Sequence, residues 1–557
     1  MTLLNRIIDR AFRLPPPSTR DIEVRKGLRI PAHDGAELLA DLYLPRRTPD
    51  APTLLVRTPY GRSGLLSRLA GRPFAERGYN VVVAACRGTD GSGGTFDPMA
   101  DDDSDGLATL DWIEKEPWHN GTVVLYGPSY LGYTQLAMAP EAGNRVAAIM
   151  PMITTSAFRD IWYEGDSFSL AAALAWTAEM AIRDRRSPLA ADILTGLKAG
   201  RVRTAMQHLP LNETDKLGTG QTSGWFQDWL VSNEPGDPYW GPKRDHRARI
   251  GNITTPTLLF GGWYDIILPG QLADYAAMRA AGRQPYLTIG PWAHATEIYA
   301  PSMQEALPWF AAHTRGDHSG LRDQPVRLYV QGAGEWREYP DWPPPGITGR
   351  EWHLQPGRGL SPDRPADGPP DRFRYNPADP TPSVGGPLLD PKAAGRKDNA
   401  KLEARADVLV YTSEPLREPA EVIGPVSARI QLRSSQEHAD VFVRLCDVDP
   451  RGRSFNVCDG LQRITPQRFP ASDDGTRTVP VRLWPTAYRF QPGHRLRVQI
   501  SGGAFPRLTR NPGTGEPLAT ATRTVPVDYE IRHSSSITLP VLPARTPASP
   551  QSSPQSA

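Results

Sequence analysis

The chain has 557 residues, too many for a single hydrophobic core, so about two to four domains are expected. Hydrophobic residues make up 39% of the chain and charged residues 22%, which is an ordinary balance for a globular protein. The net charge of +2 gives no reason to expect nucleic acid or a membrane surface as a partner.

The first 153 residues predict the opening part of an α/β domain. Residues 24–44 are typical of two strands around an Asp-Gly turn, and helix-like sequence separates the apolar runs that follow. Because strands alternate with helices, we expect a parallel sheet with helices on both faces. The apolar runs are residues 52–61, 79–88, 122–127 and 146–152.

Consecutive aspartates open the helix-like segment 101–118, "DDDSDGLATLDWIEKEPW". Carboxylates suit the positive end of a helix dipole, so the segment predicts the start of a helix. A metal site is the alternative, but no histidine or paired carboxylate accompanies these acids. We predict neither a metal nor another cofactor for this chain. The cysteines show no C-x-x-C spacing and are expected to be small buried hydrophobic residues; they are Cys86, Cys446 and Cys458.

The alternation of strands and helices stops at about residue 153. Residues 154–249 are rich in Ala, Trp and charged side chains and mostly helical in type, as in "SFSLAAALAWTAEMAIRDRR". Alternation resumes with "TPTLLFGGWYD", so residues 250–349 are expected to complete the α/β domain. Residues 154–249 then form a helical cap inserted into that domain, where such caps commonly roof the active site.

The composition changes after the Pro/Gly-rich linker "PDWPPPGITG". Residues 350–543 contain many short strands separated by turns and no clear helix, which predicts an all-β sandwich or jelly roll. The last residues, 544–557, are rich in Pro, Ser and Gln and are expected to be disordered.

No targeting or membrane segment is expected. The first 18 residues have neither a continuous apolar region nor a small-residue cleavage site, so a secretory signal is not predicted. No run of about 18 apolar residues occurs, so no helix is expected to span a membrane. We therefore expect a cytoplasmic protein, and the chain could assemble as a homodimer.

Ser129 lies in "YGPSYLGYTQ", between the strand-like "GTVVLYG" and a helix-compatible segment. A strand that runs through Gly-x-Ser into a helix is the nucleophile elbow of α/β-hydrolases. The pentapeptide G-x-S-x-G is not met, because position 131 is Leu and the second glycine is Gly132. An ordinary loop serine is the alternative, so the rest of the chain has to supply the partners of a nucleophile.

Asp265 and His294 are placed to be those partners. The strand "TLLFGG" leads to Asp265, and after a helix the strand "PYLTIG" leads to the loop that carries His294. Both side chains are expected at the carboxyl edge of neighbouring parallel strands, where Ser129 also lies and where ligands bind in open α/β sheets. The chain order Ser, Asp, His is that of α/β-hydrolases. His313 and His318 are weaker candidates for the base, because they follow helical sequence.

Several motifs together resemble the bacterial cocaine esterase group, whose members include α-amino-acid ester hydrolases and X-Pro dipeptidyl-peptidases. The resemblance covers the chain from about residue 24 to 543. It rests on "RTPYGR", "RGTDGSGGTFDP", "YGPSYLGYTQ", "GGWYDI", "GPWAH" and "PGHRLRVQISGGAFPR". It implies an α/β-hydrolase domain, a helical cap and a C-terminal jelly roll. The elbow of this group runs Gly-x-Ser-Tyr-x-Gly, so Gly132 stands in its usual place.

The resemblance also implies roles for single residues. Ser129 would be the nucleophile, Asp265 the orienting acid and His294 the base. The Tyr60 hydroxyl and the Tyr130 backbone N–H would form the oxyanion hole. This is physically sensible, because the N–H after an elbow serine points at the developing oxyanion and a neutral tyrosine can donate a second hydrogen bond.

Residues of the cap are candidates for substrate recognition. The resemblance implies that Trp162 and Trp176 line the acyl pocket, and packing within the cap core is the alternative. In α-amino-acid ester hydrolases, acidic residues just after the triad aspartate help to bind the substrate ammonium, but residues 266–268 here are Ile, Ile and Leu. Glu164 and Asp166 of the cap could still recognise an N-terminal amine.

The leading hypothesis is a serine hydrolase of carboxylic esters that acts on a small-molecule ester or amide. An X-Pro dipeptidyl-peptidase or an α-amino-acid ester or amide hydrolase is the alternative within the same chemistry. An alternative of another class is a non-catalytic protein whose jelly roll binds a carbohydrate or a partner.

Overall fold

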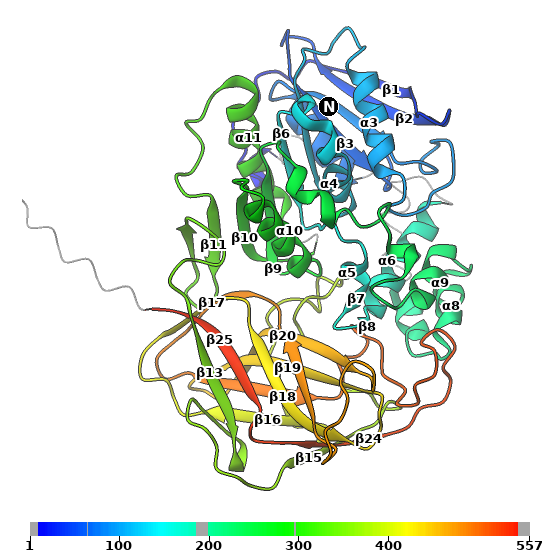
Figure 1. Ribbon diagram of the computed structural model, residues 1–557. Helices are drawn as coiled ribbons and strands as arrows, with labels where there is room; N and C mark the ends of the chain where they lie inside the picture. Colours follow the sequence, from blue (N-terminus) through cyan, green and yellow to red (C-terminus); the bar gives the residue numbers. More distant parts are fainter. Residues whose placement is uncertain (1–8, 64, 185–198, 295–296, 544–557) are drawn as a thin grey trace, which may run out of the picture.

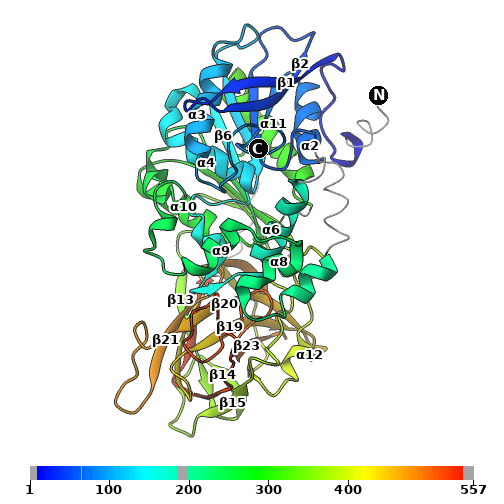
Figure 2. The ribbon, with the colours of Figure 1, turned by 90° about the vertical axis from the view of Figure 1, so that its right-hand side faces the viewer.

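The computed structural model describes residues 9–63, 65–184, 199–294 and 297–543 (Figure 1). The predicted disordered tail, residues 544–557, lies outside the described residues. An α/β sheet with its helices occupies one end of the molecule and a β domain the other end, and α5 to α9 lie beside the junction between them (Figures 1 and 2). Within the described part of the chain, no helix combines the length and apolar character that crossing a membrane requires.

The α/β part is built on a ten-stranded sheet with the order β1-β2-β4-β3-β5-β6-β9-β10-β11-β12. The strands from β4 to β11 pair in parallel, and the outer pairs β1–β2, β2–β4 and β11–β12 are antiparallel. All residues of β3, β4, β5, β6 and β9 are buried, as a parallel sheet covered by helices on both faces requires. The strands are β1 Ile22–Pro31, β2 Glu37–Pro45, β3 Thr53–Thr58, β4 Asn80–Ala85, β5 Val123–Pro128, β6 Ala148–Met152, β9 Leu258–Tyr264, β10 Tyr286–Ala293, β11 Val326–Val330 and β12 Glu335–Tyr339.

The helices of this part follow the predicted alternation. They are α2 Leu65–Ala75, α3 Asp102–Ile113, α4 Tyr130–Ala142, α10 Leu268–Ala280 and α11 Tyr299–Arg315. The aspartates of segment 101–118 begin a helix, as predicted. Two of their side chains also form ion pairs with the sheet. Asp102 and Asp105 are buried beside Arg57 of β3, at 3.4 and 3.8 Å, so they pair with a cation of the sheet.

The segment between β6 and β9 is largely helical, as predicted. Its helices include α5 Arg159–Trp162, α6 Leu170–Arg183, α8 Thr214–Thr219 and α9 Gly224–Val231, and residues 199–205 are also helical. The sequence did not indicate the short hairpin of β7 (Tyr163–Glu164) and β8 (Ser167–Phe168). At its turn, a Cβ on Gly165 would lie 1.7 Å from the Leu461 carbonyl oxygen, so only glycine lets the hairpin pack against the β domain.

The C-terminal domain is all-β except for one short helix, α12 Ala400–Glu403, which the prediction of no helix overlooked. Its strands form one hydrogen-bonded network of thirteen and pair almost entirely antiparallel. The sequence indicated strands at residues 407–413, 426–435, 439–448, 478–490, 494–503 and 535–542, and all of them are present. It missed β13, β14, β15, β17, β24 and β20, the last of which pairs with β19 along its whole length. The strands are β13 Thr348–Gln355, β14 Gly359–Ser361, β15 Asp371–Tyr375, β16 Val408–Ser413, β17 Ala420–Gly424, β18 Ser427–Ser434, β19 Ala439–Val448, β20 Ser454–Ile464, β21 Arg477–Arg482, β22 Thr486–Phe490, β23 Arg495–Ser501, β24 Val527–Ile531 and β25 Ser536–Leu542.

Short 3₁₀ turns complete the described chain at Gly143–Arg145, Leu211–Glu213, Pro238–Trp240, Arg247–Asn252 and Pro356–Arg358. All three cysteines are buried and unpaired, as expected. The domain boundaries at residues 153, 249 and 349 stay predictions.

Candidate active site

Ser129 stands at a sharp turn between β5 and α4. Its backbone has φ +57° and ψ −123°, a strained conformation for a residue with a side chain, and its N–H donates to the Met152 carbonyl at 2.8 Å. Gly132 comes one position later than the G-x-S-x-G motif requires, and the packing of α4 explains why a glycine is needed there. A Cβ on Gly132 would lie 2.7 Å from Thr154 Cγ2, so α4 can pass close to the end of β6 only with glycine at this position.

The structure brings Ser129, His294 and Asp265 into one hydrogen-bonded chain. His294 Nε2 lies 3.1 Å from Ser129 Oγ, and His294 Nδ1 lies 2.8 Å from Asp265 Oδ2. Asp265 and His294 are only 1% and 7% exposed, so solvent barely screens the pair. These contacts have the lengths and the order that a nucleophile, a base and an orienting acid need.

The sheet explains why residues far apart in the sequence meet here. β5, β6, β9 and β10 are consecutive parallel neighbours, and the three residues follow the carboxyl ends of β5, β9 and β10. The second oxygen of Asp265 accepts the N–H of Ile267 at 2.8 Å, which fixes the carboxylate toward His294. The weaker candidate His313 lies in α11 against the ring of Trp309, with a centroid distance of 4.4 Å.

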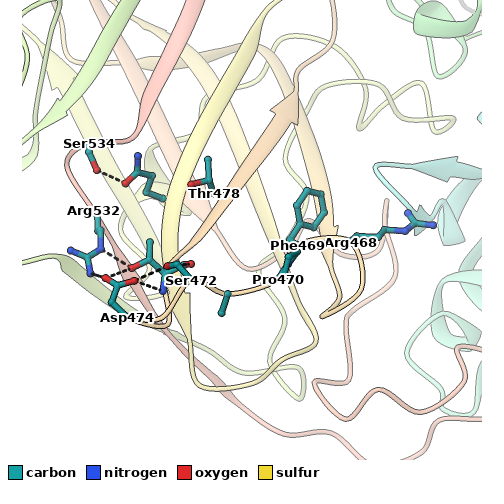
Figure 3. Close-up of a pocket in the computed structure, with 11 residues that line it drawn as sticks. Arg468, Phe469, Pro470, Ser472, Asp474, Thr478, Arg532 and Ser534 are labelled. Atoms are coloured by element: carbon teal, nitrogen blue, oxygen red, sulfur yellow. Dashed lines mark hydrogen bonds and ion pairs between the residues drawn. The ribbon is translucent and has the colours of Figure 1, made fainter.

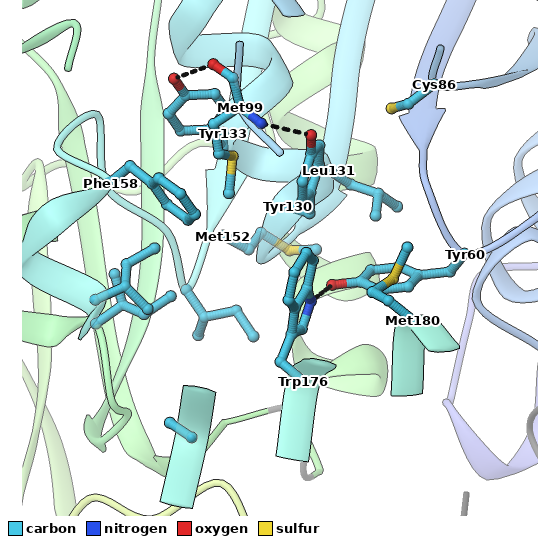
Figure 4. Close-up of a cluster of buried hydrophobic side chains, with 14 of the residues drawn as sticks. Tyr60, Cys86, Met99, Tyr130, Leu131, Tyr133, Met152, Phe158, Trp176 and Met180 are labelled. Carbon is cyan, nitrogen blue, oxygen red and sulfur yellow. Dashed lines mark hydrogen bonds between the residues drawn. The ribbon is translucent and has the colours of Figure 1, made fainter. Parts of the chain in front are cut away.

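Tyr60 and Tyr130 both lie next to Ser129: the Tyr60 side chain interacts with the Ser129 side chain, and Tyr130 follows Ser129 in the sequence. Tyr60 follows β3, and its hydroxyl accepts a hydrogen bond from Trp176 Nε1 at 3.0 Å (Figure 4). Burial raises the pKa of Tyr60 far above its usual value, and interactions with Trp176, Arg183 and the Ser129 side chain lower it in part. The phenol is therefore neutral and able to donate. Tyr130 is the first residue of α4, and its own hydroxyl accepts the Met99 N–H at 2.9 Å.

The two predicted tryptophans belong to one aromatic cluster of the cap. The centroids of Trp162 and Trp176 are 6.0 Å apart, and Trp229 of α9 stacks on Trp162 at 4.3 Å. Trp176 also lies parallel to the ring of Tyr130, at 6.4 Å, so it is the member that reaches the nucleophile elbow. No sequence pattern indicated Trp229, because α9 meets α5 and α6 only through the tertiary fold.

Glu164 and Asp166 are engaged by arginines of the β domain. Glu164 accepts bonds from Arg507 at 2.6 Å and from Trp484 Nε1 at 3.1 Å. Asp166 pairs with Arg468 and lies 3.5 Å from Arg159. Both carboxylates therefore link the cap to the β domain, and their suggested role in recognising a substrate amine stays a prediction.

The described surface is hollowed at places other than the Ser129–His294–Asp265 chain. A cleft of about 840 Å³ is bordered by Tyr60, by the end of α6 and by the Gly-rich loop 88–96, which places that loop beside the site. A polar hollow of about 700 Å³ lies on the β domain near Phe469 and Arg532 (Figure 3). There Asp474 already accepts hydrogen bonds from Arg532 and neighbouring hydroxyls. Among the described residues, no group of three or more His, Cys, Asp or Glu side chains could hold a metal ion.

Comparisons with known proteins show to which family the chain belongs. Residues 34–296 match the X-Pro dipeptidyl-peptidase (S15 family), and residues 319–536 match the X-Pro dipeptidyl-peptidase C-terminal non-catalytic domain. The cocaine esterase of Rhodococcus sp. (strain MB1 Bresler) is 32% identical, over 93% of this chain and 98% of the relative. The chain belongs to this family of serine hydrolases.

Solved structures share the fold over nearly the whole chain. An α-amino acid ester hydrolase has a TM-score of 0.82 at 23% identity and covers 95% of this chain and 98% of its own. An aminopeptidase from a marine sediment archaeon (Thaumarchaeota archaeon) has a TM-score of 0.81 at 21% identity, with the same coverage. The predicted fold class, an α/β-hydrolase domain with an inserted helical cap and a C-terminal all-β domain, is confirmed.

Proposed function

We propose that this serine hydrolase cleaves carboxylic esters of small molecules through an acyl-enzyme intermediate. The observation that carries the proposal is the hydrogen-bonded chain Ser129–His294–Asp265, with contacts of 3.1 and 2.8 Å at the carboxyl edge of the sheet. The family membership and the 32% identity to a cocaine esterase support it.

In the first half-reaction, Ser129 Oγ attacks the ester carbonyl carbon while its proton passes to His294 Nε2. Asp265 holds the Nδ1–H of His294 and stabilises the imidazolium that forms. The carbonyl oxygen becomes an oxyanion, which the Tyr130 N–H and the neutral Tyr60 hydroxyl would stabilise. When the tetrahedral intermediate collapses, His294 returns the proton to the leaving alkoxide and the acyl group stays on Ser129.

In the second half-reaction, water replaces the alcohol and His294 takes a proton from it. The hydroxide attacks the acyl carbon through a second oxyanion in the same hole, and collapse releases the carboxylic acid and restores Ser129.

An X-Pro dipeptidyl-peptidase remains the second candidate, because the matched family carries that description. Such an enzyme has to bind the free amine of a peptide, and an unpaired carboxylate is the group that does so best. The pairing of Glu164 with Arg507 and of Asp166 with Arg468 favours the ester over the peptide.

The test is to label the purified protein with a fluorophosphonate and to assay it against a panel of p-nitrophenyl esters beside Gly-Pro-p-nitroanilide. We expect labelling that Ser129→Ala abolishes, and ester turnover well above that of the anilide. An unlabelled protein that hydrolyses no ester would refute the proposal. A labelled protein that prefers Gly-Pro-p-nitroanilide would establish the peptidase instead.

A further inference from the structure

A side chain of the cap forms a hydrogen bond with the Tyr60 hydroxyl. Trp176 Nε1 of α6 donates to the Tyr60 hydroxyl at 3.0 Å, although the two residues are 116 positions apart in the sequence (Figure 4). The side chains are 9% and 7% exposed, so water competes little for either partner. Because the Tyr60 oxygen accepts this bond, the contact influences the direction in which the Tyr60 hydroxyl can donate its own proton.

An indole N–H can only donate, so the Tyr60 oxygen is the acceptor in this bond. A phenol has one proton, which is then left to point at another acceptor. Ser129 is among the groups that shift the pKa of Tyr60, so the hydroxyl faces the nucleophile. A hydrogen bond received by the oxygen also polarises the O–H bond and makes it a stronger donor. Both effects favour donation to an oxyanion that forms beside Ser129.

The same face of α6 also fixes the backbone of Tyr60. Arg183 lies seven residues after Trp176, about two helical turns away, so the two side chains lie on one side of the helix. Arg183 Nη1 donates to the Tyr60 carbonyl at 2.8 Å, and its guanidinium lies 5.1 Å from the centre of the Tyr60 ring. α6 therefore contacts the carbonyl, the ring and the hydroxyl of one residue.

We propose that Trp176 is a positioning residue of the oxyanion hole: its indole N–H orients and polarises the Tyr60 hydroxyl. This differs from a role as a wall of the acyl pocket, because a wall would act through the shape of its ring and not through its nitrogen. The inference rests on the proposed function, since it assigns Trp176 an effect on the oxyanion of that reaction.

The experiment compares two Trp→Phe variants of the same aromatic cluster. Trp176→Phe removes the N–H that Tyr60 accepts. Trp225→Phe is the matched control, because its ring centre lies 6.3 Å from that of Trp176 and its buried indole nitrogen has no hydrogen-bond partner among the described residues. With a good p-nitrophenyl ester, we expect Trp176→Phe to lower kcat about 5- to 10-fold with little change in KM. Trp225→Phe should leave kcat within about twofold.

A double-mutant cycle then tests whether Trp176 acts through Tyr60. In a Tyr60→Phe background there is no hydroxyl to orient, so adding Trp176→Phe should change kcat by less than about twofold. If the two losses multiply in full, Trp176 acts independently of Tyr60 and the inference is wrong. If Trp176→Phe and Trp225→Phe lower kcat equally, the ring and not the nitrogen matters, and the inference is also wrong.

A second substitution covers the case in which Trp176→Phe unfolds. 3-Benzothienylalanine at position 176 keeps the shape of the indole and replaces only the N–H by sulfur, so the same loss in kcat is expected with an unchanged midpoint of thermal unfolding. Fluorophosphonate labelling of the parent separates the two proposals. A labelled, active parent with unaffected 176 variants refutes only the inference, whereas an unlabelled, inactive parent refutes the proposed function.

Discussion

The edge of the sheet and the cap build the same site in different ways. Ser129, Asp265 and His294 are placed by backbone geometry: one strained turn and the ends of two neighbouring strands. The cap contributes through side chains that meet across the fold, such as Trp176 with Tyr60. The difference implies that changes at the sheet edge remove the chemistry itself, whereas changes in the cap weaken it or loosen its attachment.

The largest effect should come from the sheet edge. Ser129→Ala removes the attacking oxygen and should lower kcat by at least about 10⁴-fold, while the midpoint of thermal unfolding stays close to that of the parent. Steady-state assays on the best ester of the panel, with thermal unfolding in parallel, measure both. A variant that kept a tenth of the activity would remove Ser129 from its role.

The attachment of the cap should affect stability rather than chemistry. Arg507 is 5% exposed and bridges Glu164 of β7 and Asp459 of β20, and Asp459 also pairs with Arg444 at 2.9 Å. Arg507→Met leaves the buried Asp459 and the half-buried Glu164 each short of a counterion, so the protein should lose about 3–5 kcal/mol of stability. Chemical denaturation measures this loss.

A control for that loss lies in the same contact between cap and β domain. Arg468 pairs with Asp166 but its side chain is 27% exposed, so Arg468→Met should cost no more than about 1 kcal/mol. Equal losses in the Arg507 and Arg468 variants would mean that burial does not distinguish the two pairs, and would contradict the prediction.

Tyr60 connects the sheet edge with the cap, because it follows β3 and accepts a hydrogen bond from Trp176 of α6. Tyr60→Phe keeps the ring and deletes the hydroxyl, so kcat should fall about 10²–10³-fold, or about 3–4 kcal/mol, with little change in KM. Both acylation and deacylation should slow, because each passes through an oxyanion. A rate within threefold of the parent would show that another group supplies the second hydrogen bond.

The same contrast explains how much the sequence could predict. The strands, the elbow and the approach of Ser129, Asp265 and His294 follow from local signals: apolar runs, turn residues and the rule that parallel strands end at one edge. Resemblance to a family added Tyr60, for which the sequence alone offered only an aromatic residue after a strand.

The contacts of the cap could not be predicted, since they depend on side chains that the tertiary fold brings together. The ion-pair partners of Glu164 and Asp166, which are Arg507 and Arg468, lie more than 300 residues further along the chain, so no local pattern indicated these pairs. β20 was missed because its Asp459 and Gly460 are residues that strands disfavour. Asp459 is tolerated because two arginines compensate its charge.

The smallest of these effects concerns the base of the cap, where His246 is fully buried and its backbone N–H donates to the Ser156 carbonyl at 3.0 Å. Burial, and to a smaller extent the neighbouring Arg249, lower the pKa of His246 to about 4, although Asp103 raises it in part. In the unfolded chain its pKa is about 6.5. Between these values the unfolded state binds a proton that the folded state does not.

The contribution of neutral His246 to the free energy of unfolding should therefore be fully present above about pH 6.5. It should be lost as the pH falls toward 4, which lowers the free energy of unfolding by about 3 kcal/mol. His246→Gln cannot take up a proton, so its midpoint of thermal unfolding should fall less steeply than that of the parent between pH 6.5 and 4. Ser129→Ala is the control, because it leaves His246 in place and should follow the parent. Parallel curves for the parent and His246→Gln would mean that His246 takes up its proton equally in the folded and unfolded states, which would contradict the lowered pKa.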